Sequence, residues 1–289
     1  MTLQAPAELS PVDTLLEQTI RDIDIPPRPL IIERIQAEMR NDDANLKSLG
    51  QLIGADVSLA AGLIKTANSP YFGTRNRMRS VDQALSVLGL KTASLAIAGI
   101  ALRNAFPATA QLERFWHTSA QIAALSGWLA QTRLSGKLRA DDAYTYGLFR
   151  DAGIAIMLRH FPSYRETLTS ANHDCERPFT SVERQVFPTD HAMIGSVLAL
   201  DWWLPEEISR AIRFHHQTSA GFEPGLSPAT RYLIATAQLA EHLVQKITGR
   251  CHTSEWPKLG PICLQLLALT EDDLAIIYQD AAAILAAVD

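Results

Sequence analysis

Cysteine is scarce in this sequence: a chain of 289 residues has three, far apart at Cys175, Cys251 and Cys263. An odd number at such spacing excludes a disulfide framework and favours a reducing compartment, the cytoplasm. The chain also lacks a glycine-rich phosphate loop, a Gly-x-Ser-x-Gly elbow and the paired cysteine and histidine spacing of a zinc module. P-loop nucleotide hydrolases, elbow-type serine hydrolases and zinc fingers are therefore excluded.

An excess of positive charge is missing as well. Lys and Arg number 26 against 31 Asp and Glu, which gives a net charge of −5 and a pI near 5.9. No general attraction to nucleic acid or to an anionic membrane follows from this balance. Residues 1–10 carry no Lys or Arg, unlike a signal peptide, and the most apolar window, 95–102, is too short to span a membrane. We therefore expect a cytoplasmic protein that binds neither nucleic acid nor a membrane.

The chain instead has apolar residues spaced for helices. Hydrophobic residues make up 47% of it and charged residues 20%, an ordinary globular balance. Apolar positions recur at three and four residues almost everywhere, and no convincing period-two run is present. Ser80 with Gln83, and Thr180 with Glu183, have the spacing of capping boxes at helix starts. The sequence predicts an all-α fold of roughly a dozen helices.

A dispersed set of polar residues lies on these predicted helices. Each is flanked by apolar neighbours, and buried Asp and Arg are rare unless they are paired. These side chains would therefore have to meet one another or an ion, although a single buried histidine is more often only a satisfied core residue. We expect Asp151 to be paired with Arg150 or with a protonated histidine from another helix, rather than with a metal. The set comprises His117, Arg150, Asp151, His191, His215 and His216.

At these positions the sequence resembles the HDOD domains, which are non-standard relatives of the HD phosphohydrolases. The resemblance covers about 25–217 and rests on many short motifs that occur in the same order. They are 25–29 (IPPRP), 56–59 (DVSL), 67–73 (ANSPYFG), 80–84 (SVDQA), 88–89 (LG), 115–117 (FWH), 147–153 (GLFRDAG), 190–195 (DHAMIG), 203–205 (WLP) and 215–216 (HH).

The resemblance implies a two-lobed helical HDOD domain over 25–217. Phe106-Pro107 is our candidate for the boundary between its lobes, 25–106 and 107–217. An N-terminal helix within 1–24 would precede the domain. A helical extension, 218–289, would follow it and pack on the second lobe.

The resemblance also implies a degraded version of the HD metal site. The His-Asp pair of active HD enzymes reads Arg150-Asp151 here, and arginine has no lone pair to give to a metal. A later Asp of that site aligns with Gln238, which is a weaker, uncharged ligand. We therefore expect no catalytic residues and no cofactor. Weak binding of a divalent metal would use His117, Asp151, His191 and His215.

Three arginines alternate in one short segment, Arg75, Arg77 and Arg79. An arginine cluster can bind phosphate or a carboxylate in bidentate fashion, so the segment is a candidate contact for an anion or an acidic partner. A solvated loop is the simpler reading of the same pattern.

The functional expectation is a non-catalytic regulatory module in signal transduction, such as the output domain of a bacterial two-component system. It would act by binding a protein partner, and a nucleotide or phosphate ligand is compatible with this role. Two alternatives stay open. One is a metal-dependent phosphohydrolase acting on a nucleotide or a cyclic dinucleotide. The other is a pure scaffold, in which the polar cluster is a buried electrostatic network.

Overall fold

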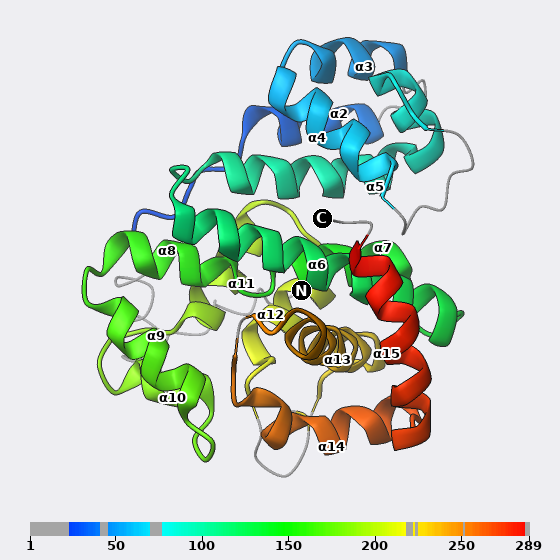
Figure 1. Ribbon diagram of the computed structural model, residues 1–289. Helices are drawn as coiled ribbons and strands as arrows, with labels where there is room; N and C mark the ends of the chain where they lie inside the picture. Colours follow the sequence, from blue (N-terminus) through cyan, green and yellow to red (C-terminus); the bar gives the residue numbers. More distant parts are fainter. Residues whose placement is uncertain are drawn as a thin grey trace, which may run out of the picture.

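The computed structural model describes residues 23–40, 46–69, 77–217, 222, 225–250 and 252–286. All regular secondary structure in these ranges is helical, which confirms the all-α prediction (Figure 1). The helix expected within 1–24 lies outside the described residues, apart from its last two positions, which are not helical.

The helices fall into three groups along the chain. Those of the first lobe are α2 (Leu30–Met39), α3 (Leu46–Gly54), α4 (Val57–Ala67) and α5 (Val81–Asn104). Those of the second lobe are α6 (Ala110–Arg133), α7 (Ala140–Phe149), α8 (Ala152–His160), α9 (Tyr164–His173), α10 (Phe179–Arg184), α11 (His191–Asp201) and α12 (Glu206–Phe214). The C-terminal helices are α13 (Pro228–Thr248), α14 (Glu255–Leu267) and α15 (Glu271–Ala286).

Helix α5 joins two hydrophobic cores. Ile97 belongs to the smaller core, between α2, α3, α4 and α5, whereas Leu102 belongs to the larger core of the second lobe. Phe106 is buried in the larger core as well. Helix α5 thus contributes to both cores, and it runs between the two groups of helices in Figure 1. The lobe boundary at Phe106-Pro107 stays a prediction.

Local sequence accounts for the shape of α5. Ser80 Oγ accepts a hydrogen bond from the Gln83 amide at 3.2 Å, and Gln83 Oε1 accepts one from the Arg79 amide at 2.8 Å, which confirms the capping box. Gly89 has φ 71° and interrupts the helix. Among the described residues, α5 alone has the length and apolar composition of a membrane-spanning helix, and 56% of its apolar window is buried inside the protein.

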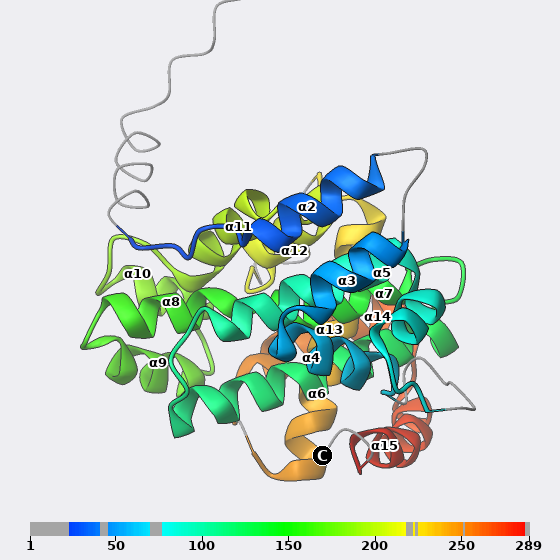
Figure 2. The same cartoon turned by 90° about the horizontal axis from the view of Figure 1, so that it is seen from above.

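The C-terminal helices are part of the second lobe. Helix α13 packs against α6, α7, α12 and α14, and its Ala235 and Leu239 are fully buried in the larger core. Viewed from above, the helices of the first lobe lie in front of α13 (Figure 2). Helices α13 and α14 border the polar cluster described next, through Glu241 and Glu255.

Candidate functional site

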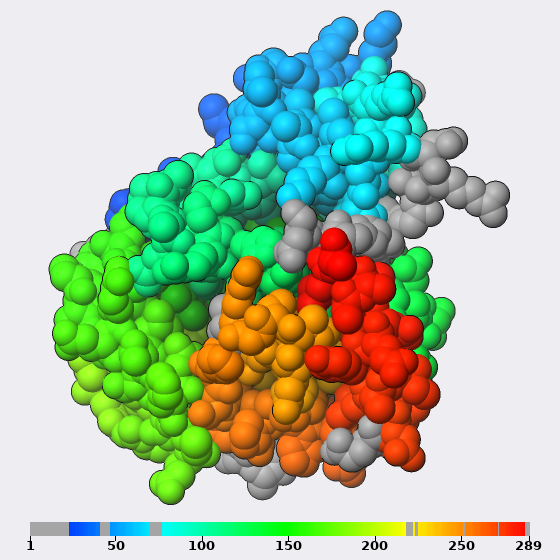
Figure 3. Space-filling model, viewed as in Figure 1, coloured from blue at the N-terminus to red at the C-terminus, as the bar shows by residue number. Residues whose placement is uncertain are grey.

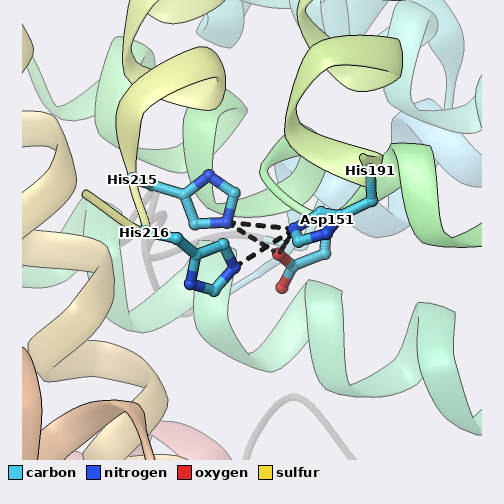
Figure 4. A group of neighbouring side chains, drawn as sticks. All are labelled: Asp151, His191, His215 and His216. Carbon is cyan, nitrogen blue, oxygen red and sulfur yellow. Dashed lines mark hydrogen bonds and ion pairs between the residues drawn. The ribbon is translucent and has the colours of Figure 1, made fainter. Parts of the chain in front are cut away.

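Four of the polar side chains meet in the second lobe: Asp151, His191, His215 and His216 (Figure 4). Asp151 lies at the junction of α7 and α8, His191 is the first residue of α11, and the adjacent His215 and His216 follow α12. One donor atom from each residue lies within 4.8 Å of those of the other three. The three imidazoles are buried, and Asp151 is partly exposed.

Two glycines bring the starts of α8 and α11 together. A Cβ atom on Gly153 would lie 2.0 Å from the His191 carbonyl oxygen and 2.9 Å from the Gly195 amide nitrogen. Only glycine allows the two backbones to approach this closely. The cap of α11 then fixes its first turn, because Asp190 Oδ1 accepts a hydrogen bond from the Met193 amide at 2.7 Å. His191 is thereby held beside Asp151.

The inward-facing atoms of the cluster are close enough to share one cation. His191 Nε2 lies 3.1 Å from His216 Nε2 and 3.4 Å from His215 Nε2. Asp151 Oδ1 lies 3.2 Å from His215 Nε2 and 3.8 Å from His191 Nε2.

Each imidazole also has a partner for its outer nitrogen. His191 Nδ1 lies 2.8 Å from Glu183 Oε2, and His216 Nδ1 lies 2.6 Å from Glu255 Oε2. His215 Nδ1 lies 2.7 Å from the Ile212 carbonyl oxygen. All three partners are acceptors, so the Nδ1 atoms carry protons and the Nε2 lone pairs of neutral imidazoles point inward. Metal-binding histidines characteristically have such acceptors behind them.

The three histidines differ in how their surroundings shift the pKa. Burial disfavours the charged form of His191, but the Glu183 carboxylate outweighs burial and raises the His191 pKa to about 9. Burial lowers the His216 pKa to about 3. Burial lowers the His215 pKa as well. The surroundings therefore favour the imidazolium form at His191 and the neutral form at His215 and His216.

These residues fit one divalent transition-metal ion. Three imidazole nitrogens and one carboxylate oxygen are a donor set that zinc, iron and manganese accept. The side chains that would hold the ion are Asp151, His191, His215 and His216, and the ion would supply Lewis acidity at this position. The set differs from the one suggested by the sequence, because His216 takes the place of His117.

Arg150 lies on the other side of Asp151. Its side chain is 3% exposed, and one terminal nitrogen, Nη2, lies 2.9 Å from Asp151 Oδ2 and 2.7 Å from Glu241 Oε1. The expected pairing of Arg150 with Asp151 is thus confirmed. Although burial alone would raise the Asp151 pKa, the Arg150 charge and the hydrogen bond to His215 hold it well below its usual value.

The remaining predicted residues lie outside the four-residue cluster. Gln238 is buried on α13, where its side-chain amide donates to Glu241 Oε2 at 3.1 Å. His117, on α6, borders a cavity beside the cluster. Arg77 and Arg79 are exposed and do not line this cavity. Arg75 lies outside the described residues.

Three buried glutamates are part of the site, although their sequence positions did not reveal it. The sequence predicts that Glu183 and Thr180 cap a helix, but α10 begins at Phe179. The Glu183 carboxylate instead accepts hydrogen bonds from His191 Nδ1 and from the Tyr164 hydroxyl. Glu241 lies one turn after Gln238, a spacing that could have suggested a shared face. Glu255 lies on α14, beyond the stretch that carries the HDOD motifs, and no local pattern marks it.

A cavity of about 690 Å³ opens beside the cluster. Asp151 and Glu241 line its polar end, and Phe115, Ile122 and Leu158 contribute to its apolar wall. None of the three clustered histidines lines it. In Figure 3 the surface is recessed in this region, below α6 and between the green and orange parts of the chain.

Glu255 offers a direct test of the metal assignment. Glu255→Gln keeps the shape of the side chain but weakens the hydrogen bond that orients His216, so the affinity for Zn²⁺ should fall by about 10–100-fold. Titration calorimetry on the metal-free protein measures the change. Glu206→Gln is the matched control, because the Glu206 side chain is 76% exposed and is paired with Arg210, not with a histidine of the cluster. Equal affinities of both variants would show that Glu255 does not support a ligand.

A family model and one curated relative match this chain. The model for the HDOD domain matches residues 25–218. An uncharacterized protein of Treponema pallidum (strain Nichols) is 26% identical over 254 residues, which cover 87% of this chain and 48% of that protein. The chain therefore spans about half the length of this curated relative.

Solved structures share the fold. A "Putative phosphohydrolase" from Shewanella amazonensis SB2B has a TM-score of 0.69 at 20% identity, with 95% of this chain and 98% of that chain covered. An HDOD domain protein with unknown function from Geobacter sulfurreducens has a TM-score of 0.67 at 22% identity, with 96% of each chain covered. A "Putative signal transduction protein" from Marinobacter aquaeolei VT8 has a TM-score of 0.68 at 20% identity, with 96% and 64% covered. Together with the family match over well more than half of the sequence, this fold establishes that the chain belongs to the HDOD domain family.

Proposed function

We propose that this chain is a non-catalytic regulatory module of a signalling pathway, which acts by binding a partner or a small ligand. The proposal rests on the burial of the three histidines away from the cavity. His191, His215 and His216 are at most 5% exposed, and none of them lines the neighbouring cavity. A metal held by these residues and Asp151 would have four protein ligands. Structural zinc sites have this arrangement, whereas catalytic sites keep a position open for water or substrate.

Arg150 supports the same proposal from the other side of Asp151. A hydrolytic metal centre must bind a water and a phosphate oxygen at once. Here the space beyond Asp151 Oδ2 is filled by a guanidinium group that is itself paired with Glu241. The charge of Arg150 is permanent, and none of its nitrogens can act as a ligand or as a base.

The cavity suits a small ligand with an apolar body and a polar end. Its volume of about 690 Å³ lies within the range of ligand pockets, and it is lined mostly by apolar atoms. Such a ligand would contact Asp151, and through it the pair with Arg150. Ligand binding would thus bias the contacts of Arg150, at the junction of α7 and α8, with Ala237 and Glu241 of α13, which is how a regulatory module would pass on a signal.

The principal rival is a metal-dependent phosphohydrolase acting on a nucleotide or a cyclic dinucleotide. The name of the Shewanella amazonensis structure agrees with this rival, and that of the Marinobacter aquaeolei structure agrees with signalling. The donor set of the cluster is compatible with both. A pure scaffold, the third candidate, would have no use for the cavity.

A hydrolysis assay separates the first two candidates. Protein loaded with Mn²⁺, Fe²⁺ or Zn²⁺ should not hydrolyse p-nitrophenyl phosphate, bis-p-nitrophenyl phosphate or cyclic dinucleotides faster than Asp151→Asn does. The variant retains the size of the side chain but loses the carboxylate that every metal-dependent mechanism here would need. Turnover that depends on metal and disappears in Asp151→Asn would establish the phosphohydrolase.

The proposal includes a cytoplasmic setting, in a bacterial two-component pathway with a protein partner. Within the described part of the chain, Cys175 is an exposed free thiol and Cys263 a buried one, as is usual in a reducing compartment.

A further inference from the structure

We propose that the Arg150 guanidinium takes the place of a second metal ion, so that this site accepts one divalent ion and no more. We expect one bound ion per chain whether or not the module hydrolyses a substrate.

The first observation is the position of the Asp151 carboxylate between two positive centres. Oδ1 lies 3.2 Å from His215 Nε2 and 3.8 Å from His191 Nε2, facing the cluster that fits a metal. Oδ2 lies 2.9 Å from a terminal nitrogen of Arg150. One oxygen thus faces each centre, as in a carboxylate that bridges two cations.

The second observation is the environment of the guanidinium, which consists of oxygen acceptors. Asp151 Oδ2 and Glu241 Oε1 are paired with Arg150, and the Ala237 carbonyl oxygen accepts a hydrogen bond from it at 3.4 Å. Two carboxylates and a carbonyl are ligands that a hard divalent cation prefers. In this chain the cation among them is a side chain that is always charged.

The third observation is that both carboxylate oxygens of Glu241 already have side-chain partners. Gln238 donates its amide hydrogen to Glu241 Oε2 at 3.1 Å, while Glu241 Oε1 is paired with Arg150. Both oxygens of the buried Glu241 carboxylate are therefore satisfied by side chains, and none is left for an ion. A divalent cation entering here would also be repelled by Arg150, which is 3% exposed.

The charges agree with a single ion. Asp151, Glu183, Glu241 and Glu255 surround the cluster, and each has a cationic or hydrogen-bonding partner. Arg150 neutralises one of the two carboxylates that it contacts. One divalent ion among the histidines can then be balanced by the carboxylates that remain, whereas a second ion would leave excess positive charge in the interior.

The experiment counts metal ions per chain. Full-length protein is stripped with chelator, loaded with Co²⁺ or Mn²⁺, passed through a desalting column and analysed for metal by mass spectrometry. The wild type should hold one ion per chain, and its Co²⁺ absorption should saturate at one equivalent. Arg150→His removes the fixed cation and places an imidazole beside Asp151 and Glu241, so it should hold two.

Two variants identify the second position. Arg150→Gln removes the charge without supplying a ligand as strong as imidazole, so it should hold one ion. Arg150→His combined with Glu241→Gln should return from two ions to one. Two ions in the wild type, none in the wild type, or one ion in a folded Arg150→His variant would each overturn the proposal. If Arg150→His does not fold, the Co²⁺ titration of the wild type is the test, because tight binding of a second equivalent of Co²⁺ would refute the proposal.

Discussion

Asp151→Ala is expected to lower the free energy of unfolding by about 3–5 kcal/mol, measured in the presence of EDTA so that metal binding plays no part. Among the described residues, the substitution leaves the buried Arg150 with Glu241 as its only ionic partner, and it removes the carboxylate from His215. An uncompensated charge in the interior is costly because water cannot solvate it. The melting temperature should fall by on the order of 10 °C.

Asp142→Ala is the matched control. The Asp142 side chain is 21% exposed, close to the 18% of Asp151, but its cationic partners, Lys91 and Arg139, are exposed. Exposed pairs of this kind contribute at most about 1 kcal/mol. The two aspartates should therefore differ clearly in urea unfolding. A loss of less than about 1 kcal/mol for Asp151→Ala would mean that Arg150 finds other compensation, and it would remove the ion pair as a stabilising element.

The sequence predicted the helices and much of the cluster for identifiable physical reasons. Apolar spacing reports which face of a helix is buried, and this information is local. Arg150 and Asp151 are neighbours in the chain, so their pairing needed no tertiary information. The histidines were singled out because each lies among apolar neighbours on a predicted helix and within one of the family motifs.

The partners of these residues could not be predicted, because they depend on how distant helices pack. Glu255 reaches His216 across 39 positions of sequence, and Glu241 reaches Arg150 across 91 (241 − 150). The expected metal ligand His117 illustrates the same limit. Its helix lies over the cavity, but only the packing of α6 decides that His216 and not His117 completes the cluster.

Gly153 shows how one small residue determines this packing. Gly153→Ala is expected to destabilise the protein by about 3 kcal/mol or more, the upper end of overpacking effects, although alanine normally favours a helix over glycine. The new Cβ would lie 2.0 Å from the His191 carbonyl oxygen and 2.8 Å from its carbon. Both atoms are backbone, so α11 can make room only by moving away from α8. His191 would then separate from Asp151, and Zn²⁺ affinity should fall together with stability.

Two other glycines provide a graded series for this experiment. Gly54 is the last residue of α3, and a Cβ there would meet nothing within 4 Å, so Gly54→Ala should leave stability within about 0.5 kcal/mol of the wild type. A Cβ on Gly195 would meet the Ile212 side chain at 3.1 Å and the Gly153 amide nitrogen at 3.4 Å, which a small shift relieves. Gly195→Ala should therefore be intermediate. Urea unfolding measures the stability of the three variants. If Gly153→Ala is as stable as the wild type and binds Zn²⁺ with the same affinity, close contact of α8 and α11 does not hold the cluster together.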